Sequence, residues 1–210
     1  INDKTHQTIY FSLEDKNLEI KEMTSKSCRF EYKNQEYKLN VGGEHNIQNA
    51  LSVIEAGLFA GLTSDIIAKG LEEFAPIEKR WDIKEVKGFK IINDSYNSNP
   101  ESVKAAIKTF LLYTESPKSV VLGDMGELGL NEEEYHNETG KFLEQFECDY
   151  VLTIGELAKH INPRNKKTFH FDNKTDLVDF IKKNLPKGSN ILLKASRFMK
   201  FEEIIEELDK

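Results

Sequence analysis

The chain has 210 residues, of which 39% are apolar and 31% are charged, enough for one large or two small globular domains. Its formal net charge is -7 with both signs interspersed, which argues against a nucleic-acid-binding protein that relies on a basic face. No apolar run approaches the roughly 20 residues of a membrane-spanning helix, so we expect no membrane insertion. Two cysteines, Cys28 and Cys148, are too few for a disulfide framework and are typical of a cytoplasmic protein.

The first part of the chain, up to about residue 42, shows β-rich runs separated by polar turn formers, which indicates antiparallel hairpins. The predicted strands cover residues 8–14, 18–23, 27–33 and 36–42. From His45 onwards the apolar side chains recur at helical spacing. A second helix is predicted over residues 64–74 with Ser64 as its N-cap, and residues 77–79 are interpreted as a linker.

From about residue 82, short apolar strands alternate with amphipathic helices, which predicts an α/β fold with a mostly parallel, doubly wound sheet. The strands are expected at residues 89–94, 119–124, 150–155, 167–171 and 190–195. The helices are expected at residues 101–112, 132–146, 156–161, 175–185 and 199–208. The pattern therefore divides the chain into two domains, with the boundary placed between residues 80 and 81.

Ligands of open α/β sheets bind outside the carboxyl ends of the strands, so the loops that follow these strands hold the candidate site residues. In the first loop, Asp94 is suited to accept ribose hydroxyls, and Tyr96 is suited to pack against a base. Asn99 stands before Pro100, the order typical of a helix start. The alternative is that Asp94, Asn97 and Asn99 only form turn and cap hydrogen bonds.

The second loop has its glycines three residues apart, which differs from the dinucleotide-binding pattern G-x-G-x-x-G and favours a tight strand-to-helix turn. Asp124 and Glu127 in this loop either hold an ammonium group or a metal-bound water, or form a solvated acidic turn. A third loop, with Ser196 and Arg197, follows the last strand. All three loops are expected at one edge of the sheet.

Further candidates lie outside these loops. His45, Asn46 and Asn49 either cap the first helix and cover its polar face, or present amide groups that match an adenine edge. Arg80 is placed to bridge a phosphate between the two domains, and His136 is expected at an exposed helical position. The sequence contains no P-loop pattern G-x-x-x-x-G-K-[ST], so the main phosphate-binding element of an ATP-using protein would have to lie elsewhere.

Five segments in this order resemble the Mur ligase family, namely GEHNIQNAL, KR, NDSYNSNPESVKAAI, VVLGDMGELG and ILLKASRFMKFEEII. The DSYNxNP and GDMxELG blocks are similar to the branch of that family that adds D-alanyl-D-alanine. The resemblance implies that residues 1–80 are the C-terminal part of a central ATP-binding domain and residues 81–210 a Rossmann-like C-terminal domain. It also implies that the P-loop and the Mg²⁺ ligands belong to a preceding portion, and that this fragment is inactive alone.

The resemblance implies an ATP-dependent amide ligase of cytoplasmic peptidoglycan precursor synthesis. The expected substrates are ATP, UDP-N-acetylmuramoyl-tripeptide and D-Ala-D-Ala, and the expected partners are the protein's own N-terminal and central domains. The nucleotide-binding residues it implies are His45, Asn46, Asn49, Arg80, Asp94 and Tyr96. The acceptor-binding residues it implies are Asn97, Asn99, Asp124, Glu127, Lys194, Ser196 and Arg197. Two alternatives stay open: a ligase of the same superfamily with another acceptor, and a non-catalytic nucleotide-binding module.

Overall fold

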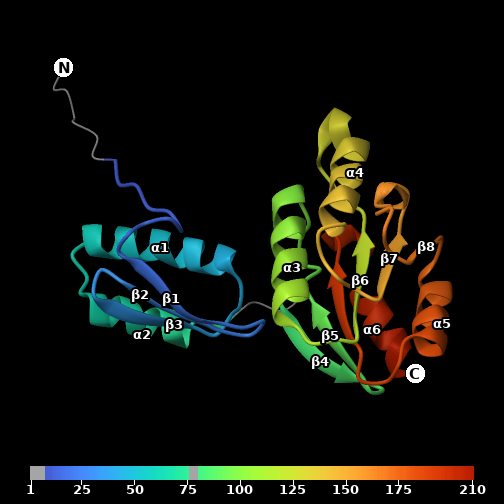
Figure 1. Ribbon diagram of the computed structural model, residues 1–210, viewed down its shortest axis with the longest axis horizontal. Helices are drawn as coiled ribbons and strands as arrows, with labels where there is room; N and C mark the ends of the chain where they lie inside the picture. Colours follow the sequence, from blue (N-terminus) through green and yellow to red (C-terminus); the bar gives the residue numbers. More distant parts are fainter. Residues whose placement is uncertain (1–7, 76–79) are drawn as a thin grey trace. The chain divides into compact units, whose positions relative to one another are not determined.

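The computed structural model describes residues 8–75 and 80–210, and the chain divides into two compact units, Ile1–Ala75 and Pro76–Lys210. Figure 1 shows the elements of both units along the chain. The division falls before residues 80 and 81, where the sequence placed a boundary. The expected linker at residues 77–79 lies outside the described residues.

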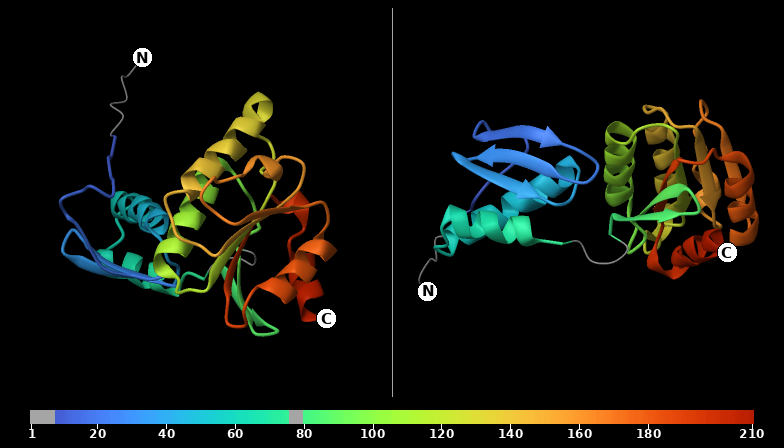
Figure 2. Two further views of the ribbon diagram at one scale, coloured as in Figure 1. Left: turned by 45° about the vertical axis from the view of Figure 1, so that its right-hand side comes forward. Right: turned by 90° about the horizontal axis from the view of Figure 1, so that it is seen from below.

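The first unit is a small antiparallel sheet with two helices. Strands β1 (Leu18–Met23), β2 (Cys28–Tyr32) and β3 (Gln35–Leu39) lie in that order, and helices α1 (Glu44–Phe59) and α2 (Ser64–Glu73) follow. Alternate residues of β2 are buried, so the sheet presents one apolar face. Both helices pack against this face and share its core, as the right-hand view of Figure 2 shows.

Two predictions for this unit are wrong in detail. Residues 8–14 form no strand, because only Phe11 and Leu13 of this run pack against the core and Ile9 and Tyr10 are exposed. The N-cap of α2 is Thr63 and not Ser64: the Thr63 hydroxyl accepts the hydrogen bond of the Ile66 amide. Both residue types cap helices well, so the sequence alone does not separate the two positions.

The second unit contains a six-stranded sheet in the order β4-β5-β9-β6-β7-β8. Its strands are β4 (Asp82–Val86), β5 (Phe89–Asn93), β6 (Lys118–Gly123), β7 (Tyr150–Ile154), β8 (Thr168–Phe171) and β9 (Asn190–Lys194). All neighbouring pairs are parallel except β4 and β5, which form a hairpin. The predicted mostly parallel α/β fold is confirmed, and β4, an edge strand with three charged residues that the apolar pattern did not predict, is added to it.

Helices cover both faces of this sheet. On one face, α3 (Pro100–Tyr113) and α4 (Glu132–Leu143) pack against Val120 and Leu122 of β6. On the other, α5 (Lys174–Asn184) and α6 (Glu202–Asp209) pack against the core that includes Val121 of the same strand. This alternation buries the strand on both sides, as a doubly wound sheet requires. The helix predicted over residues 156–161 is only a 3₁₀ turn, Ala158–His160. Two further 3₁₀ turns, Gly129–Asn131 and Arg197–Met199, precede α4 and α6.

None of the described helices is both long enough and apolar enough to cross a membrane.

Candidate functional site

The carboxyl ends of β5, β9 and β6 lie side by side, because β9 pairs with β5 on one side and with β6 on the other. The loops after these strands therefore meet at one edge of the sheet, as the sequence predicted. The amino end of β4 lies at the same edge, since Asp82 pairs with Asn93 in antiparallel register. This pairing brings Arg80, two residues before β4, close to the loop after β5. We call this edge with its loops the carboxyl edge.

The loop after β5 is shaped by its own asparagines. The Asn93 side chain is buried, and its Oδ1 accepts hydrogen bonds from the Ser95 amide and the Ser95 hydroxyl, at 3.3 and 2.6 Å. Asn97 Oδ1 accepts from the Ser98 amide at 2.8 Å. Asn99 caps α3 through a reciprocal pair of hydrogen bonds with Ser102, which confirms its expected position at a helix start.

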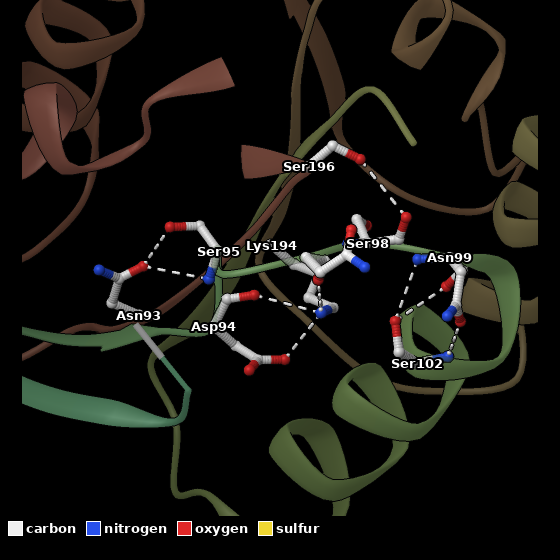
Figure 3. A network of polar contacts seen from close by, with 9 residues as sticks. Asn93, Asp94, Ser95, Ser98, Asn99, Ser102, Lys194 and Ser196 are labelled. Atoms are coloured by element: carbon white, nitrogen blue, oxygen red, sulfur yellow. Dashed lines mark hydrogen bonds and ion pairs between the residues drawn. The ribbon is translucent and has the colours of Figure 1, made fainter. Parts of the chain in front are cut away.

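Lys194, the last residue of β9, lies beneath this loop with a side chain that is only 3% exposed. Its ammonium is 3.0 Å from Asp94 Oδ2 and donates to the carbonyl oxygens of Asp94 at 3.2 Å and Asn97 at 2.6 Å. Figure 3 shows this network from close by. A lysine has three N–H donors, so these three partners match its full capacity. The structure therefore engages Lys194 within the chain, in a position where the resemblance implied a contact with the acceptor.

Ser196, in the loop after β9, forms hydrogen bonds with the loops after β5 and β6. Its hydroxyl accepts a hydrogen bond from the Gly126 amide at 2.8 Å and donates to the Ser98 carbonyl at 3.4 Å, while its own amide donates to the Asp124 carbonyl. The hydroxyl of Ser98 is buried and has no hydrogen-bond partner among the described residues. Hydrogen bonds of Ser196 thus connect the three loops of the carboxyl edge, and Figure 3 shows the one to the Ser98 carbonyl.

Asp124 is buried, and its carboxylate is not part of a solvated acidic turn. Asp124 Oδ1 accepts hydrogen bonds from the amides of Leu157 and Ala158, at 3.0 and 2.7 Å. Gly155 packs directly on the same carboxylate, leaving no room for a side chain. Glu127 from the same loop is exposed and has a positive φ of 63°. The two acidic residues therefore differ: Asp124 holds the loop that follows β7, and Glu127 faces solvent.

His136 lies behind this second loop and is fully buried, so the expectation of an exposed position is wrong. Its Nε2 accepts the hydrogen bond of the Met125 amide at 3.0 Å, and its Nδ1 lies 2.6 Å from the Glu132 carbonyl oxygen. These partners fit a neutral ring that carries its proton on Nδ1. Burial lowers the pKa of His136 below its ordinary value of 6.5. The face of α4 that carries His136 is therefore a packing face.

Tyr96, Arg80 and Arg197 form the exposed part of the carboxyl edge. The Tyr96 ring is 37% exposed, and the guanidinium carbons of Arg80 and Arg197 lie 4.5 and 5.5 Å from its centroid. Both arginines are exposed, and neither forms an ion pair with a described residue. Two cations beside an aromatic face provide stacking surface and positive charge together. Such an arrangement suits an anionic ligand that carries a flat ring.

A cleft extends the site beyond the predicted residues. A cleft of about 520 Å³ opens next to Arg197, between the ends of β7 and β8, the start of α5 and the segment Phe198–Met199. The Lys174–Glu203 ion pair lines it. Among residues 8–75 and 80–210, no group of three or more His, Cys, Asp or Glu side chains is arranged to hold a metal ion.

The remaining predicted residues, His45, Asn46 and Asn49, lie in the first turns of α1 and belong to the first unit. Asn46 Nδ2 donates to the Gly42 carbonyl at 2.7 Å, a local hydrogen bond at the start of the helix. Asn49 is exposed. The other ten predicted residues all lie in the second unit, at the carboxyl edge.

Comparison with known proteins adds the family context. Residues 79–197 match the family model described as "Mur ligase, glutamate ligase domain". A UDP-N-acetylmuramoyl-tripeptide–D-alanyl-D-alanine ligase of Bacillus subtilis is 42% identical over 174 residues, which cover 79% of this chain and 38% of that protein. The chain thus spans well under half the length of this relative.

Solved structures show the same similarity. The crystal structure of MurF from Acinetobacter baumannii superposes with a TM-score of 0.81 at 26% identity, over 92% of this chain and 45% of that chain. MurF from Thermotoga maritima, solved in complex with ADP, superposes with a TM-score of 0.76 at 24% identity, over 93% of this chain and 47% of that chain. At that identity the second similarity supports the fold alone.

Proposed function

We propose that this chain, which belongs to the Mur ligase family, forms part of an ATP-dependent ligase that joins D-Ala-D-Ala to UDP-N-acetylmuramoyl-tripeptide. Support for the acceptor comes from the Bacillus subtilis relative, whose name states this reaction. The structural observation that carries the proposal is the exposed part of the carboxyl edge, where the guanidinium groups of Arg80 and Arg197 both lie over the Tyr96 ring. The reaction belongs to peptidoglycan precursor synthesis, which we place in the cytoplasm.

The proposed reaction forms an amide at the expense of ATP. The terminal carboxylate of the tripeptide attacks the γ-phosphorus and becomes an acyl phosphate, with ADP as the leaving group. The amine of D-Ala-D-Ala then attacks the acyl carbon, loses a proton, and the tetrahedral intermediate expels inorganic phosphate. Because both substrates are anionic, alignment and charge neutralisation are the main contributions that protein side chains can make.

On the nucleotide side, we assign Tyr96 to the base and the two flanking arginines to neutralisation of the phosphates. The carboxylate of Asp94 is assigned to the ribose hydroxyls. It is 19% exposed, and a carboxylate accepts several hydrogen bonds, so its ion pair with Lys194 is compatible with this role. In the first unit, Asn46, Asn49 and the adjacent His45 are assigned to the adenine edge.

On the acceptor side, we assign the exposed residues Asn97 and Glu127, which lie in neighbouring loops of the carboxyl edge. Asn99, Asp124, Lys194 and Ser196 are engaged with backbone groups, and we assign them to holding the loops rather than to direct contact. The described residues offer no cluster for Mg²⁺, so its ligands are assigned to the rest of the enzyme.

The experiment that tests the proposal is phosphate release by the complete enzyme that contains this chain. The assay contains ATP, Mg²⁺ and UDP-N-acetylmuramoyl-tripeptide, with D-Ala-D-Ala, with glutamate, or with no acceptor. Release that requires D-Ala-D-Ala supports the proposal. Release that requires glutamate would transfer the chain to a ligase with another acceptor, and ATP binding without release would make it a non-catalytic nucleotide-binding module.

A further inference from the structure

The buried ammonium of Lys194 is placed to determine the conformation of the loop that carries Tyr96. Its two carbonyl partners belong to Asp94 and Asn97, so they enclose Tyr96 in the sequence. The ammonium reaches them from β9, about a hundred positions further along the chain. Hydrogen bonds to backbone carbonyls on both sides of a residue restrict the path of the chain between them. The position of the Tyr96 ring therefore depends on Lys194.

Stability alone is a weak reason for a lysine at this place. A charge that is 3% exposed loses most of its hydration, and a buried ion pair is often replaceable by apolar side chains without loss of stability. The three residues before Lys194 in β9, Ile191 to Leu193, are apolar and fully buried, so an apolar side chain would continue their pattern. What an apolar side chain cannot provide is three donors directed at one loop.

We propose that Lys194 is a positioning residue for nucleotide binding: it holds residues 94–97 so that Tyr96 and the Asp94 carboxylate are presented together. That the ligand is a nucleotide rests on the proposed function. The effect of Lys194 on the conformation of the loop does not. It differs from the role implied by the resemblance, a direct contact with the acceptor. The two roles predict changes in different Michaelis constants, and this makes them separable.

The test uses Lys194→Met, which keeps a long unbranched side chain and removes the ammonium. Lys84→Met is the matched control, because Lys84 forms an ion pair with Asp82 but has a side chain that is 53% exposed. In the complete enzyme, Lys194→Met is expected to raise the KM for ATP about tenfold or more, the scale of losing hydrogen bonds to a charged group, with the KM for D-Ala-D-Ala changed less than about twofold. Lys84→Met is expected to leave both constants unchanged.

A double-mutant cycle separates positioning from general destabilisation. If Lys194 acts through the loop, Lys194→Met combined with Tyr96→Ala raises the KM for ATP no further than the larger single change. If the fold-increases in the KM for ATP of the two single variants multiply in the double variant, the proposal is overturned. A rise in the KM for D-Ala-D-Ala alone would also overturn it. If Lys194→Met does not fold, Lys194→Gln, which retains a donor, takes its place in the same cycle.

A second measurement is independent of ligase activity and uses the 210-residue chain itself. Hydrogen exchange of the backbone amides of residues 95–98 is expected to become at least about tenfold faster in Lys194→Met than in Lys84→Met, because loss of the ammonium allows the loop to open locally. Unchanged exchange would overturn the positioning role even in an active ligase. Faster exchange in an enzyme without D-Ala-D-Ala-dependent activity would retain the role and reject the proposed function.

Discussion

The carboxyl edge combines two groups of side chains that differ in burial and in what they contact. Asp124, Lys194 and Ser196 are buried and bind backbone amides or carbonyls of neighbouring loops. Arg80 and Arg197 are exposed, and their guanidinium groups lie over the ring of Tyr96. We call these the holding group and the exposed group. All are polar residues in loops or at strand ends of the same edge, so the difference is one of environment and not of residue type.

Because of this difference, the residues that stabilise the loops and the residues that are available to a ligand are not the same. A buried polar group that is fully hydrogen-bonded fixes its neighbours and is costly to remove, because its partners are left unsatisfied. An exposed group loses little on removal and keeps its surface for a ligand. Substitutions in the holding group should therefore change the free energy of unfolding, and at Lys194 they should also change ATP binding through the loop that carries Tyr96. Substitutions in the exposed group should change ligand binding with little effect on the free energy of unfolding.

The largest effect on stability is expected for Asp124→Ala. It removes the acceptor of the Leu157 and Ala158 amides, and each buried group left unsatisfied costs about 1–3 kcal/mol, so we expect a loss of about 2–4 kcal/mol. Denaturant unfolding followed by the fluorescence of Trp81 measures it, since this is the single tryptophan and it packs against the core of the second unit. Glu127→Ala is the control, with a change within about 0.5 kcal/mol. Equal losses in both variants would contradict the division into two groups.

A smaller but related effect is expected for Gly155→Ala. Gly155 has a φ of 121°, and an added Cβ would overlap the Asp124 carboxylate that it packs against. Gly188→Ala is matched to it, because Gly188 has a φ of 87° with open space around it. The control should lose about 1–2 kcal/mol from backbone strain alone, and Gly155→Ala about 1 kcal/mol more from overlap. The same fluorescence measurement applies, and a control that loses as much as Gly155→Ala would show that contact with Asp124 adds nothing.

His136 adds a pH dependence to the holding group. Burial lowers its pKa below 6.5, so its contribution to stability is complete above pH 6.5 and is lost as the pH falls further, when the unfolded chain binds a proton that the folded chain resists. One such proton changes the free energy of unfolding by at most about 1.4 kcal/mol per pH unit. Asp124, Glu132 and His160 also act on this ring, so the informative quantity is a difference between variants.

The matched variant is His136→Gln, whose side-chain oxygen can still accept from the Met125 amide. Between pH 8 and pH 5.5 the native chain is expected to lose about 1 kcal/mol more than this variant, measured by the same denaturant unfolding. If the free energy of unfolding has the same pH dependence in the native chain and in His136→Gln, the folded state does not disfavour protonation of the His136 ring, and the prediction is wrong.

Much of the fold follows from local patterns, whereas the holding group does not. The alternation of apolar strands and amphipathic helices is a short-range signal, and the loops after three strands could be placed at one edge by a general rule. The partners of Lys194 and Ser196 depend instead on β9 lying between β5 and β6, an order that no local pattern contains. The sequence could therefore indicate polar residues at the edge, but not which of them turn inward. His136 was misplaced for a different reason: the loop directly before α4 folds back onto the helix, so that the ring accepts the Met125 amide, and helical periodicity alone does not show this.

Arg197→Ala is expected to have the smallest effect on the free energy of unfolding while raising the KM for ATP. The guanidinium lies over the Tyr96 ring on the exposed side of the site, so its removal should leave the free energy of unfolding within about 0.5 kcal/mol of the native value. In the complete enzyme the KM for ATP should rise about threefold to tenfold, since the variant loses a cation beside the ring and the proposed phosphates. Arg164→Ala, another exposed arginine of the same unit, is the control and should change neither quantity. If Arg197→Ala instead raises only the KM for D-Ala-D-Ala, the residue belongs to the acceptor side, as the motif resemblance implied, and the exposed group spans both substrates.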